Sequence, residues 1–325
     1  MHIASYRPVV IWHGMGDTCC NPDSMGKVQE IIKDVFPGIY TYSIMIGEDE
    51  SEDKKASFFG NINEEISIVC EKLKSDENLK FGFNAIGFSQ GGQFLRAYVQ
   101  RCNDPPVYNL ITFGSPHAGV SDIPGCGGND VWCRIMRSIA SQGAYSGYVR
   151  EHIIQAQYFK DPKKLELYFE RNIYLPDINN ELEIKNETYK MNLITLNKLV
   201  LIRFTEDTTL KPGDTAWFSF YDEEGNVVPI REQPLYKEDW IGLRTLDKAG
   251  KIVFKDCEGP HMRIDENYFR EEVVIPYLNN SLRLHKRPLL IIQHKILHPL
   301  ASVASRLAGP ADPATAGVFH KYFAV

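Results

Sequence analysis

Ser89 occupies the centre of a Gly-x-Ser-x-Gly pattern that spans residues 87–91. An apolar run at 83–86 precedes the pattern, and an amphipathic run at 94–99 follows it. Strand, sharp turn and helix in this order predict a nucleophile elbow, in which the serine hydroxyl projects from the top of a sheet. The flanking glycines let strand and helix pass closely, and a helix beginning at Gln90 directs its amides toward the same point. The plainer alternative is a glycine-rich turn with an ordinary exposed serine.

His261 is the predicted general base for this nucleophile. A serine hydroxyl needs a base, and the base needs an orienting carboxylate. Where a nucleophile elbow tops a parallel sheet, the chain order is serine, acid, histidine. His117 and His152 come before the late strands, whereas His261 follows the apolar run 252–254 in a Gly-Pro-His turn.

The orienting acid is expected in the loop after the apolar run 199–204. This loop offers Glu206 and Asp207, and Asp214 lies further on. Either carboxylate type can orient a histidine, so the residues alone do not separate Glu206 from Asp207.

A glycine-rich loop at 13–17 follows a buried strand predicted at 9–12. In sheets of this kind such a loop supplies one backbone N–H to the oxyanion hole, and the residue after the nucleophile supplies the other. We therefore expect the amides of Met15 and Gln90 to receive a developing oxyanion. His13 is interpreted as a structural residue that shapes the loop. The chemistry predicted by all these groups is acyl transfer through an acyl-serine intermediate.

The elements that must position these residues alternate between strands and helices, which predicts an α/β fold with a mostly parallel sheet. The expected strands beside the elbow strand are 9–12, 39–46, 107–113, 199–204 and 252–254. The expected helices are 24–36 with Ser24 as N-cap, 59–73, the helix after Ser89, and one from 266 that Pro276 ends. A hairpin is expected from 216–221 and 226–230.

Two segments depart from this alternation. Residues from about 120 to 197 place apolar and aromatic side chains at helical spacing, which predicts a helical insertion over the open end of the sheet. We expect a hydrolase domain at 1–280 and a disordered tail at 281–325, where periodicity is lost. Four of the nine histidines lie in that tail without a recurring ligand spacing, so no metal site and no cofactor are predicted.

Composition excludes several classes of protein. The chain has 325 residues, of which 43% are hydrophobic and 24% charged, with a formal charge of −6. Without a basic block, nucleic acid is not an expected partner. No apolar run approaches the roughly 18 residues that span a bilayer, so no transmembrane segment is predicted.

Cysteines and glycosylation sequons indicate the compartment. The seven cysteines fit no zinc spacing, and sequons occur at Asn186 and Asn279. Together they favour a secretory or lysosomal protein. No signal peptide is recognisable, because the stretch 1–7 is too short and polar to hold an apolar core.

Several stretches resemble the lysosomal type 1 family of palmitoyl-protein thioesterases. They are V-V-I-W-H-G-M-G-D-T-C-C-N-P at 9–22, F-N-A-I-G-F-S-Q-G-G-Q-F-L-R-A at 83–97, E-D-T-T-L-K-P at 206–212, L-Y-K-E-D-W-I-G-L at 235–243 and E-G-P-H at 258–261. The first is much more specific than the serine pattern. The resemblance covers roughly 8–279; the absent leader and the tail after 281 depart from it.

The resemblance implies an α/β-hydrolase fold and favours Asp207, so that the triad is Ser89, Asp207 and His261. It implies hydrolysis of thioesters between long fatty acyl chains, chiefly palmitate, and a cysteine of a protein or peptide, in the lysosome or after secretion. It further implies a free, buried Cys257, glycosylation of Asn186 in preference to Asn279, and three disulfides: Cys19–Cys20, Cys70–Cys102 and Cys126–Cys133.

Two other functions use the same residues. The first is a carboxylesterase or lipase that acts on oxygen esters, which the triad itself does not distinguish. The second is a non-catalytic member of the fold that binds lipid, although no triad residue is missing. A sixteen-carbon chain could contribute on the order of 10 kcal/mol on full burial, which favours a long apolar groove. The insertion at 120–197 is the segment able to form such a groove.

Overall fold

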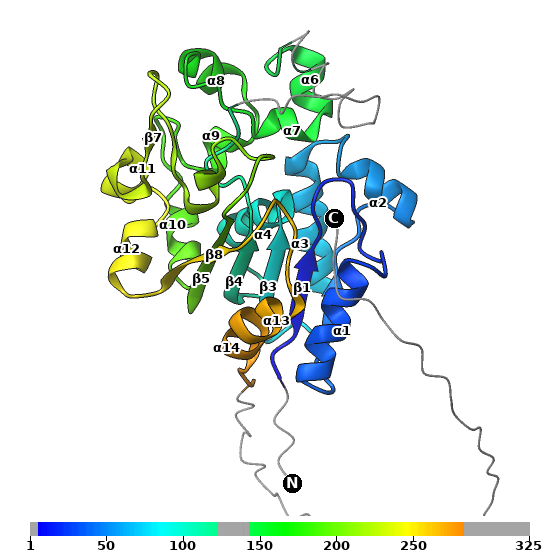
Figure 1. Ribbon diagram of the computed structural model, residues 1–325. Coiled ribbons are helices and arrows are strands. Elements are labelled where there is room, and N and C mark those ends of the chain that lie inside the picture. Colours follow the sequence, from blue (N-terminus) through cyan, green and yellow to red (C-terminus); the bar gives the residue numbers. More distant parts are fainter. Residues whose placement is uncertain (1–5, 122–138, 140–142, 283–325) are drawn as a thin grey trace, which may run out of the picture. The chain divides into compact units, whose positions relative to one another are not determined.

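The computed structural model describes residues 6–121, 139 and 143–282 (Figure 1). The strands are β1 (Val9–Trp12), β2 (Thr41–Ser43), β3 (Phe83–Phe88), β4 (Val107–Phe113), β5 (Lys198–Phe204), β6 (Phe220–Tyr221), β7 (Val227–Val228) and β8 (Ile252–Cys257). The helices up to β5 are α1 (Met25–Val35), α2 (Glu50–Ala56), α3 (Ile62–Ser75), α4 (Gln90–Arg101), α6 (Gly147–His152), α7 (Ile154–Gln157), α8 (Leu165–Arg171), α9 (Leu175–Ile178) and α10 (Glu187–Leu193). Those after β5 are the 3-10 turns η1 (Gly213–Trp217) and η2 (Ile230–Glu232), α11 (Pro234–Lys237), α12 (Leu243–Lys248), α13 (Glu266–Tyr268), the π-helical η3 (Phe269–Val274) and α14 (Ile275–Leu278).

Six strands form one parallel sheet in the order β2-β1-β3-β4-β5-β8. This order confirms the predicted α/β class, and it is the arrangement of an α/β-hydrolase. Because all six strands run the same way, their carboxyl ends meet at one edge of the sheet. The segments that carry Ser89, Asp207 and His261 each follow a strand, β3, β5 or β8, at that edge.

Alternation along the strands fills two cores, one on each face of the sheet. In β1, Val10 and Trp12 belong to the core that α3 and α4 cover, while Val9 and Ile11 belong to the core under α1 and α14. Figure 1 shows α1 and α14 on the near side of the sheet and α3 and α4 behind it. With both faces covered, the sheet holds its carboxyl edge as a rigid platform.

Several predicted element bounds were wrong. The second strand was expected at 39–46, but only three residues pair with β1, because β2 is the edge strand and the chain leaves it at once. Ser24 stands at the N-cap of α1 without capping it, since its hydroxyl donates to Asp17 Oδ2 at 2.6 Å instead. The helix expected from 59 begins at Ile62, where Asn61 accepts from the amide of Asn63 and so supplies the cap.

Two later strands also differ from their predicted bounds. The hairpin exists but is short, because the left-handed Phe218 closes a 3-10 turn over the first half of the expected strand 216–221. The last strand, β8, runs on to Cys257, since its residues 255–257 still pair with β5. Helix α2 was not predicted at all.

The final helix contradicts the expected stop at Pro276. It continues through that proline to Leu278, with a π-helical stretch just before it. A proline inside an α-helix leaves the carbonyl four residues earlier without its donor and crowds it. Here that carbonyl belongs to Glu272, and Lys255 Nζ of β8 donates to it at 3.1 Å. The widened turn and the outside donor together let the helix pass the proline.

The helices α6 to α10 lie between β4 and β5 in the chain. Figure 1 places α6, α7 and α8 beyond the carboxyl ends of the strands. Within 143–193 the structure describes helices and turns but no strand, consistent with the helical spacing of the sequence.

The expected domain bounds remain a prediction, and the tail falls outside the described residues from 283 onward. None of the helices in the described ranges is long and apolar enough to cross a membrane.

Candidate active site

Ser89 stands at the turn from β3 into α4 with a backbone φ of 49° and ψ of −123°. A positive φ is unusual for a residue with a side chain, and such strain persists where the surrounding structure enforces it. The enforcement comes from close backbone packing: a Cβ on Gly87 would lie 2.2 Å from Gly92 Cα, and one on Gly91 would lie 2.4 Å from His13 O. Only glycine fits at these positions, so the sequence pattern and the strained turn have the same steric cause.

His261 joins Ser89 to Asp207. Ser89 Oγ lies 3.0 Å from His261 Nε2, and His261 Nδ1 lies 2.6 Å from Asp207 Oδ2. With a neutral imidazole that carries its proton on Nδ1, the serine hydroxyl donates to Nε2 and Nδ1–H donates to the carboxylate. This is the geometry that a serine nucleophile, a general base and an orienting acid require.

The Asp207 carboxylate is held by its own loop. Its Oδ1 accepts from the amides of Thr209 and Leu210, both at 2.9 Å, so that Oδ2 is directed at the imidazole. Glu206 is exposed, and its amide donates to the carbonyl of Gly259. Asp214 is engaged in an ion pair with Arg203. The structure thus brings Asp207, and neither of the other candidates, into contact with His261.

The loops that carry His261 and Asp207 are tied to each other next to the triad. Thr205 donates its amide to Cys257 O, and Gly259 donates its amide to Thr205 Oγ1, both at 3.1 Å. The ring of Phe204 meets the imidazole edge to face, with 5.7 Å between ring centroids. These contacts restrict the histidine to one orientation, which lowers the ordering cost of the reaction.

The glycine-rich loop lies against the elbow, as the oxyanion-hole prediction requires. A Cβ on Gly14 would lie 3.3 Å from Ser89 Cβ, so this loop passes directly beside the nucleophile. The amides of Met15 and Gln90 remain our proposed oxyanion donors. Gln90 is buried at the first position of α4, where helix amides carry partial positive charge.

The other early histidines lie elsewhere. His117 is fully buried and stacks on Phe218, and its Nε2 shares a hydrogen bond of 3.0 Å with Thr112 Oγ1. Burial, reinforced by the nearby Arg96 charge, holds the pKa of His117 well below its usual value. His152 stacks on Tyr148 in α6. Neither contacts Ser89, in agreement with the chain-order prediction.

The family follows from comparison of the whole chain. A family model described as palmitoyl protein thioesterase matches residues 8–261. "Palmitoyl-protein thioesterase 1" of Caenorhabditis elegans is 44% identical over 272 residues, which covers 83% of this chain and 91% of that protein. The chain belongs to the palmitoyl protein thioesterase family. "Palmitoyl-protein thioesterase 3" of Dictyostelium discoideum is 37% identical and covers 86% and 94%; the "Lysosomal thioesterase PPT2 homolog" of Drosophila melanogaster is 30% identical and covers 85% and 93%.

The disulfides that the family resemblance implied are present where the structure describes them. Cys19 pairs with Cys20, Cys70 pairs with Cys102, and Cys257 is a free, buried thiol. Burial, with the charges of Asp265 and Glu258, raises the pKa of the Cys257 thiol to about 12, so it stays protonated and unreactive. The expected Cys126–Cys133 pair lies outside the described residues.

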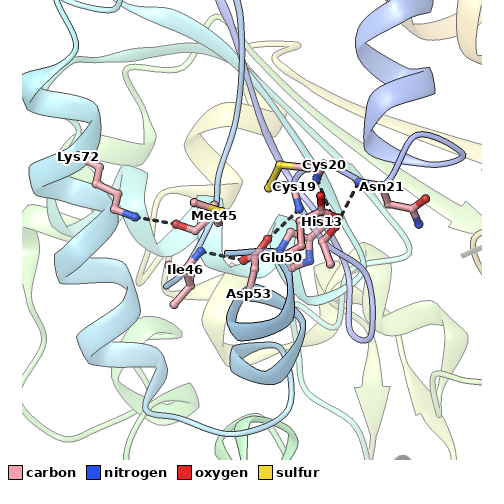
Figure 2. The surroundings of a disulfide bond; sticks show 10 residues. His13, Cys19, Cys20, Asn21, Met45, Ile46, Glu50, Asp53 and Lys72 are labelled. Carbon is pink, nitrogen blue, oxygen red and sulfur yellow. Dashed lines mark hydrogen bonds and ion pairs between the residues drawn. A yellow bond between two sulfur atoms is a disulfide. The ribbon is translucent and has the colours of Figure 1, made fainter. Parts of the chain in front are cut away.

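A buried cluster beneath the glycine-rich loop of this thioesterase family member was not predicted from sequence. Figure 2 shows Asp53 of α2 at its centre, facing Cys19 and His13. Asp53 Oδ2 accepts from the amide of Cys19 at 2.8 Å, while Oδ1 accepts from Ile46 N at 2.7 Å and contacts His13 Nε2 at 3.1 Å. Burial alone would lower the pKa of His13, but the hydrogen bond and charge of Asp53 raise it. His13 thus links the glycine-rich loop to α2 through Asp53, which agrees with the structural role expected for it.

Glu65 of α3 adds a second buried carboxyl near this cluster and yields a pH prediction. Burial, with the charges of Asp53 and Glu64, raises the pKa of Glu65 from 4.5 to about 8. Between these values the unfolded chain ionises while the folded protein keeps its proton, so this group's contribution to stability is present below pH 4.5 and lost as pH rises to about 8.

The Glu65→Gln variant is therefore expected to gain stability over wild type as pH rises. At about 1.4 kcal/mol per pKa unit, we expect a gain of roughly 2 to 4 kcal/mol at pH 7.5 and little at pH 4.5. Urea unfolding of both proteins at several pH values measures the difference in their free energies of unfolding. The other titrating groups are the same in both proteins, so their contributions cancel in this difference. A difference that stays constant across this range would contradict the prediction.

Both sequons of this family member are exposed. Asn279 lies at the end of α14, and Asn186 caps α10, where its Oδ1 accepts from the Thr188 amide at 3.0 Å. Glycosylation would use the side-chain nitrogen and leave this cap intact. Occupancy of either site remains a proposal, with Asn186 preferred.

One small apolar cavity lies close to the triad. Its volume is about 10 Å³, and it lies between α1 and the segment after His261. It is lined by Ser24, Met25, Val28, Phe88, Met262, Ile264 and Phe269. A volume near 10–15 Å³ holds about one water, so this cavity cannot hold a sixteen-carbon chain. This cavity is therefore not the predicted acyl groove, and the insertion remains the segment that we expect to form it.

Proposed function

We propose that this protein hydrolyses the thioester bond between a long-chain fatty acyl group, chiefly palmitate, and a cysteine of a protein or peptide. Membership of the palmitoyl protein thioesterase family supports the substrate class. The single observation that carries the chemistry is the hydrogen-bonded chain from Ser89 through His261 to Asp207. No metal or cofactor is needed for this reaction, because serine, histidine and aspartate supply nucleophile, base and orienting charge.

The proposed reaction has two steps. In the first, Ser89 Oγ attacks the thioester carbonyl while His261 Nε2 takes its proton, and the amides of Met15 and Gln90 donate hydrogen bonds to the oxyanion. The carbon–sulfur bond breaks, His261 returns the proton to the departing cysteine sulfur, and an acyl-Ser89 ester remains. In the second, water attacks this ester with His261 as base, which releases the fatty acid and restores Ser89. Asp207 holds the imidazole tautomer throughout.

The compartment proposed for this activity is the lysosome. Relatives are named lysosomal thioesterases, among them the Drosophila melanogaster protein. The disulfides Cys19–Cys20 and Cys70–Cys102 and the exposed sequons are features of proteins that pass through the secretory pathway. The partners proposed are S-palmitoylated proteins or their peptides, and other long-chain acyl thioesters.

The test compares three substrates: a palmitoyl-cysteine peptide, the same peptide with a four-carbon thioester, and a palmitoyl oxygen ester. We expect kcat/KM for the palmitoyl thioester to exceed that for the short thioester by at least about 10²-fold, since each buried CH₂ can contribute roughly 0.8 kcal/mol. The blank is the Ser89→Ala enzyme.

Each outcome decides between the candidate functions. Preference for the oxygen ester would assign an esterase or lipase function to the same triad. No turnover of any ester would favour a non-catalytic lipid-binding protein. Turnover that survives in Ser89→Ala would overturn the assignment of the nucleophile.

A further inference from the structure

Ser57 contacts both segments that we assign to the oxyanion hole. It is buried at the C-cap of α2, a position with no part in the triad. Its Oγ accepts from the amide of Gly16 at 2.8 Å, and its carbonyl oxygen accepts from Gln90 Nε2 at 3.0 Å. Gly16 directly follows Met15, and Gln90 directly follows Ser89. One residue thus holds the loop of the first proposed donor and the side chain of the second.

The Ser57 hydroxyl has a defined orientation. Its Oγ donates to the carbonyl of Lys54 at 2.7 Å within the last turn of α2. With its single hydrogen used there, the oxygen presents a lone pair to Gly16 N. The ring of Phe58 also packs close to this glycine, since a Cβ on Gly16 would lie 3.3 Å from Phe58 Cζ. The loop is therefore held by a directed hydrogen bond together with apolar contact.

The insertion completes the arrangement around Gln90. Gln155 Nε2 donates to the Ser57 carbonyl at 2.9 Å and to Gln90 Oε1 at 3.1 Å. The Tyr158 hydroxyl also donates to Gln90 Oε1 at 3.1 Å. Both oxygen and nitrogen of the Gln90 side chain are thus bonded, so a shift of Gln90 at the start of α4 would strain three buried hydrogen bonds.

We propose that Ser57 is a positioning residue that sets the spacing of the oxyanion hole by holding Gly16 and Gln90 on one rigid helix end. This inference rests on the proposed function, because it takes the amides of Met15 and Gln90 as the oxyanion donors. Loss of one oxyanion donor costs about 10² to 10³ in rate, and a misplacement near 1 Å costs up to about 10². A freed glycine loop falls in the latter class.

The test replaces Ser57 with alanine, which removes the hydroxyl contacts to Gly16 N and Lys54 O and keeps the carbonyl contact to Gln90. We expect Ser57→Ala to lower kcat about 10- to 100-fold with KM within about threefold, since the hole acts in the transition state. Ser57→Thr keeps the hydroxyl and is expected to retain kcat within about threefold. Ser219→Ala, at another buried serine, is the matched control and is expected to leave kcat unchanged.

A second readout separates positioning from substrate binding. A fluorophosphonate reacts with the nucleophilic serine and directs its phosphoryl oxygen into the oxyanion hole, so its inactivation rate is expected to fall by the same factor as kcat. This rate is measurable even if the thioester proves not to be the substrate, so failure of the proposed function and failure of this inference give different results. Thermal unfolding confirms that each variant is folded at the assay temperature.

Three results would overturn the inference. They are an unchanged kcat and inactivation rate in folded Ser57→Ala, an equal loss in folded Ser57→Thr, or an equal loss in Ser219→Ala. If Ser57→Ala does not fold, Ser57→Cys takes its place, because sulfur fills the site but accepts hydrogen bonds weakly. The same losses are then expected, and an unchanged rate again overturns the inference.

Discussion

The Asp207→Asn variant is expected to lose about 10⁴-fold in kcat while it stays folded. An asparagine side chain can present its amide nitrogen to His261 Nδ1, which then acts as an acceptor and places the ring proton on Nε2. The imidazole could no longer accept the proton of Ser89, which lies 3.0 Å from Nε2. It would also lose the negative charge that stabilises the imidazolium formed during attack. Steady-state hydrolysis of a palmitoyl-cysteine peptide measures the loss.

Glu206→Gln is the matched control for this variant. Glu206 is adjacent in sequence and carries the same charge, but its side chain is exposed and makes no contact with His261. We expect its kcat to stay within about twofold of wild type, because exposed charges contribute little. Equal losses in the two variants would mean that the acid is not Asp207 alone. Full activity in Asp207→Asn would refute the proposed triad.

The Arg96→Met variant is expected to lose about 3 to 6 kcal/mol of folding free energy, because the substitution leaves several buried acceptors without a donor. Arg96 of α4 is fully buried, and its guanidinium donates to carbonyls in two other segments: Ile178 O and His117 O, each at 3.2 Å. It also donates to Asn179 Oδ1 at 2.8 Å. Burial lowers the pKa of Arg96 to about 10, so the side chain remains charged near neutral pH. Methionine fills much of the volume but donates nothing.

Urea unfolding of the Arg96→Met variant beside Arg101→Met tests this expectation. Arg101 lies on the same helix and pairs with Asp177 at 2.7 Å, but its side chain is 19% exposed. Water can replace part of its contact, so we expect a loss of only about 1 to 2 kcal/mol. Because Arg96 joins the elbow helix to the insertion, its variant should also lose activity at temperatures where wild type is stable. Equal stability losses in the two variants would show that burial of Arg96 does not set its contribution.

The contacts of Arg96 and Ser57 explain how the insertion is joined to the elbow. Arg96 binds the segment at 178–179, while Ser57 and Gln90 bind Gln155 in α7. In both sets a side chain donates to a backbone carbonyl or to a side-chain amide oxygen, and the two partners lie far apart in the chain. Nothing in local composition marks either residue, because a buried arginine and a helix-end serine look like surface residues in sequence.

The sequence alone was sufficient to predict the elbow at Ser89, the parallel sheet and the position of His261. Each depends on local features: glycines where a Cβ would clash, apolar runs of strand length, and a chain order imposed by the sheet. The pairs Cys19–Cys20 and Cys70–Cys102 followed from resemblance to the family, and not from spacing.

The residues alone left Glu206 and Asp207 open, and resemblance to the family favoured Asp207. The physical reason for this choice lies in the tertiary structure, because both carboxylates stand in one loop and differ in direction. The loop amides of Thr209 and Leu210 hold the Asp207 carboxylate toward His261, whereas the Glu206 side chain is exposed to solvent. Pro276 is a second example. Its residue type predicted the end of a helix, but the helix continues because Lys255 in β8 donates to the carbonyl that the proline leaves without a donor. Residue types and their spacing thus determined which groups this protein can use. The directions of those groups, and the contacts of Ser57, depend on hydrogen bonds between segments that meet only in the fold.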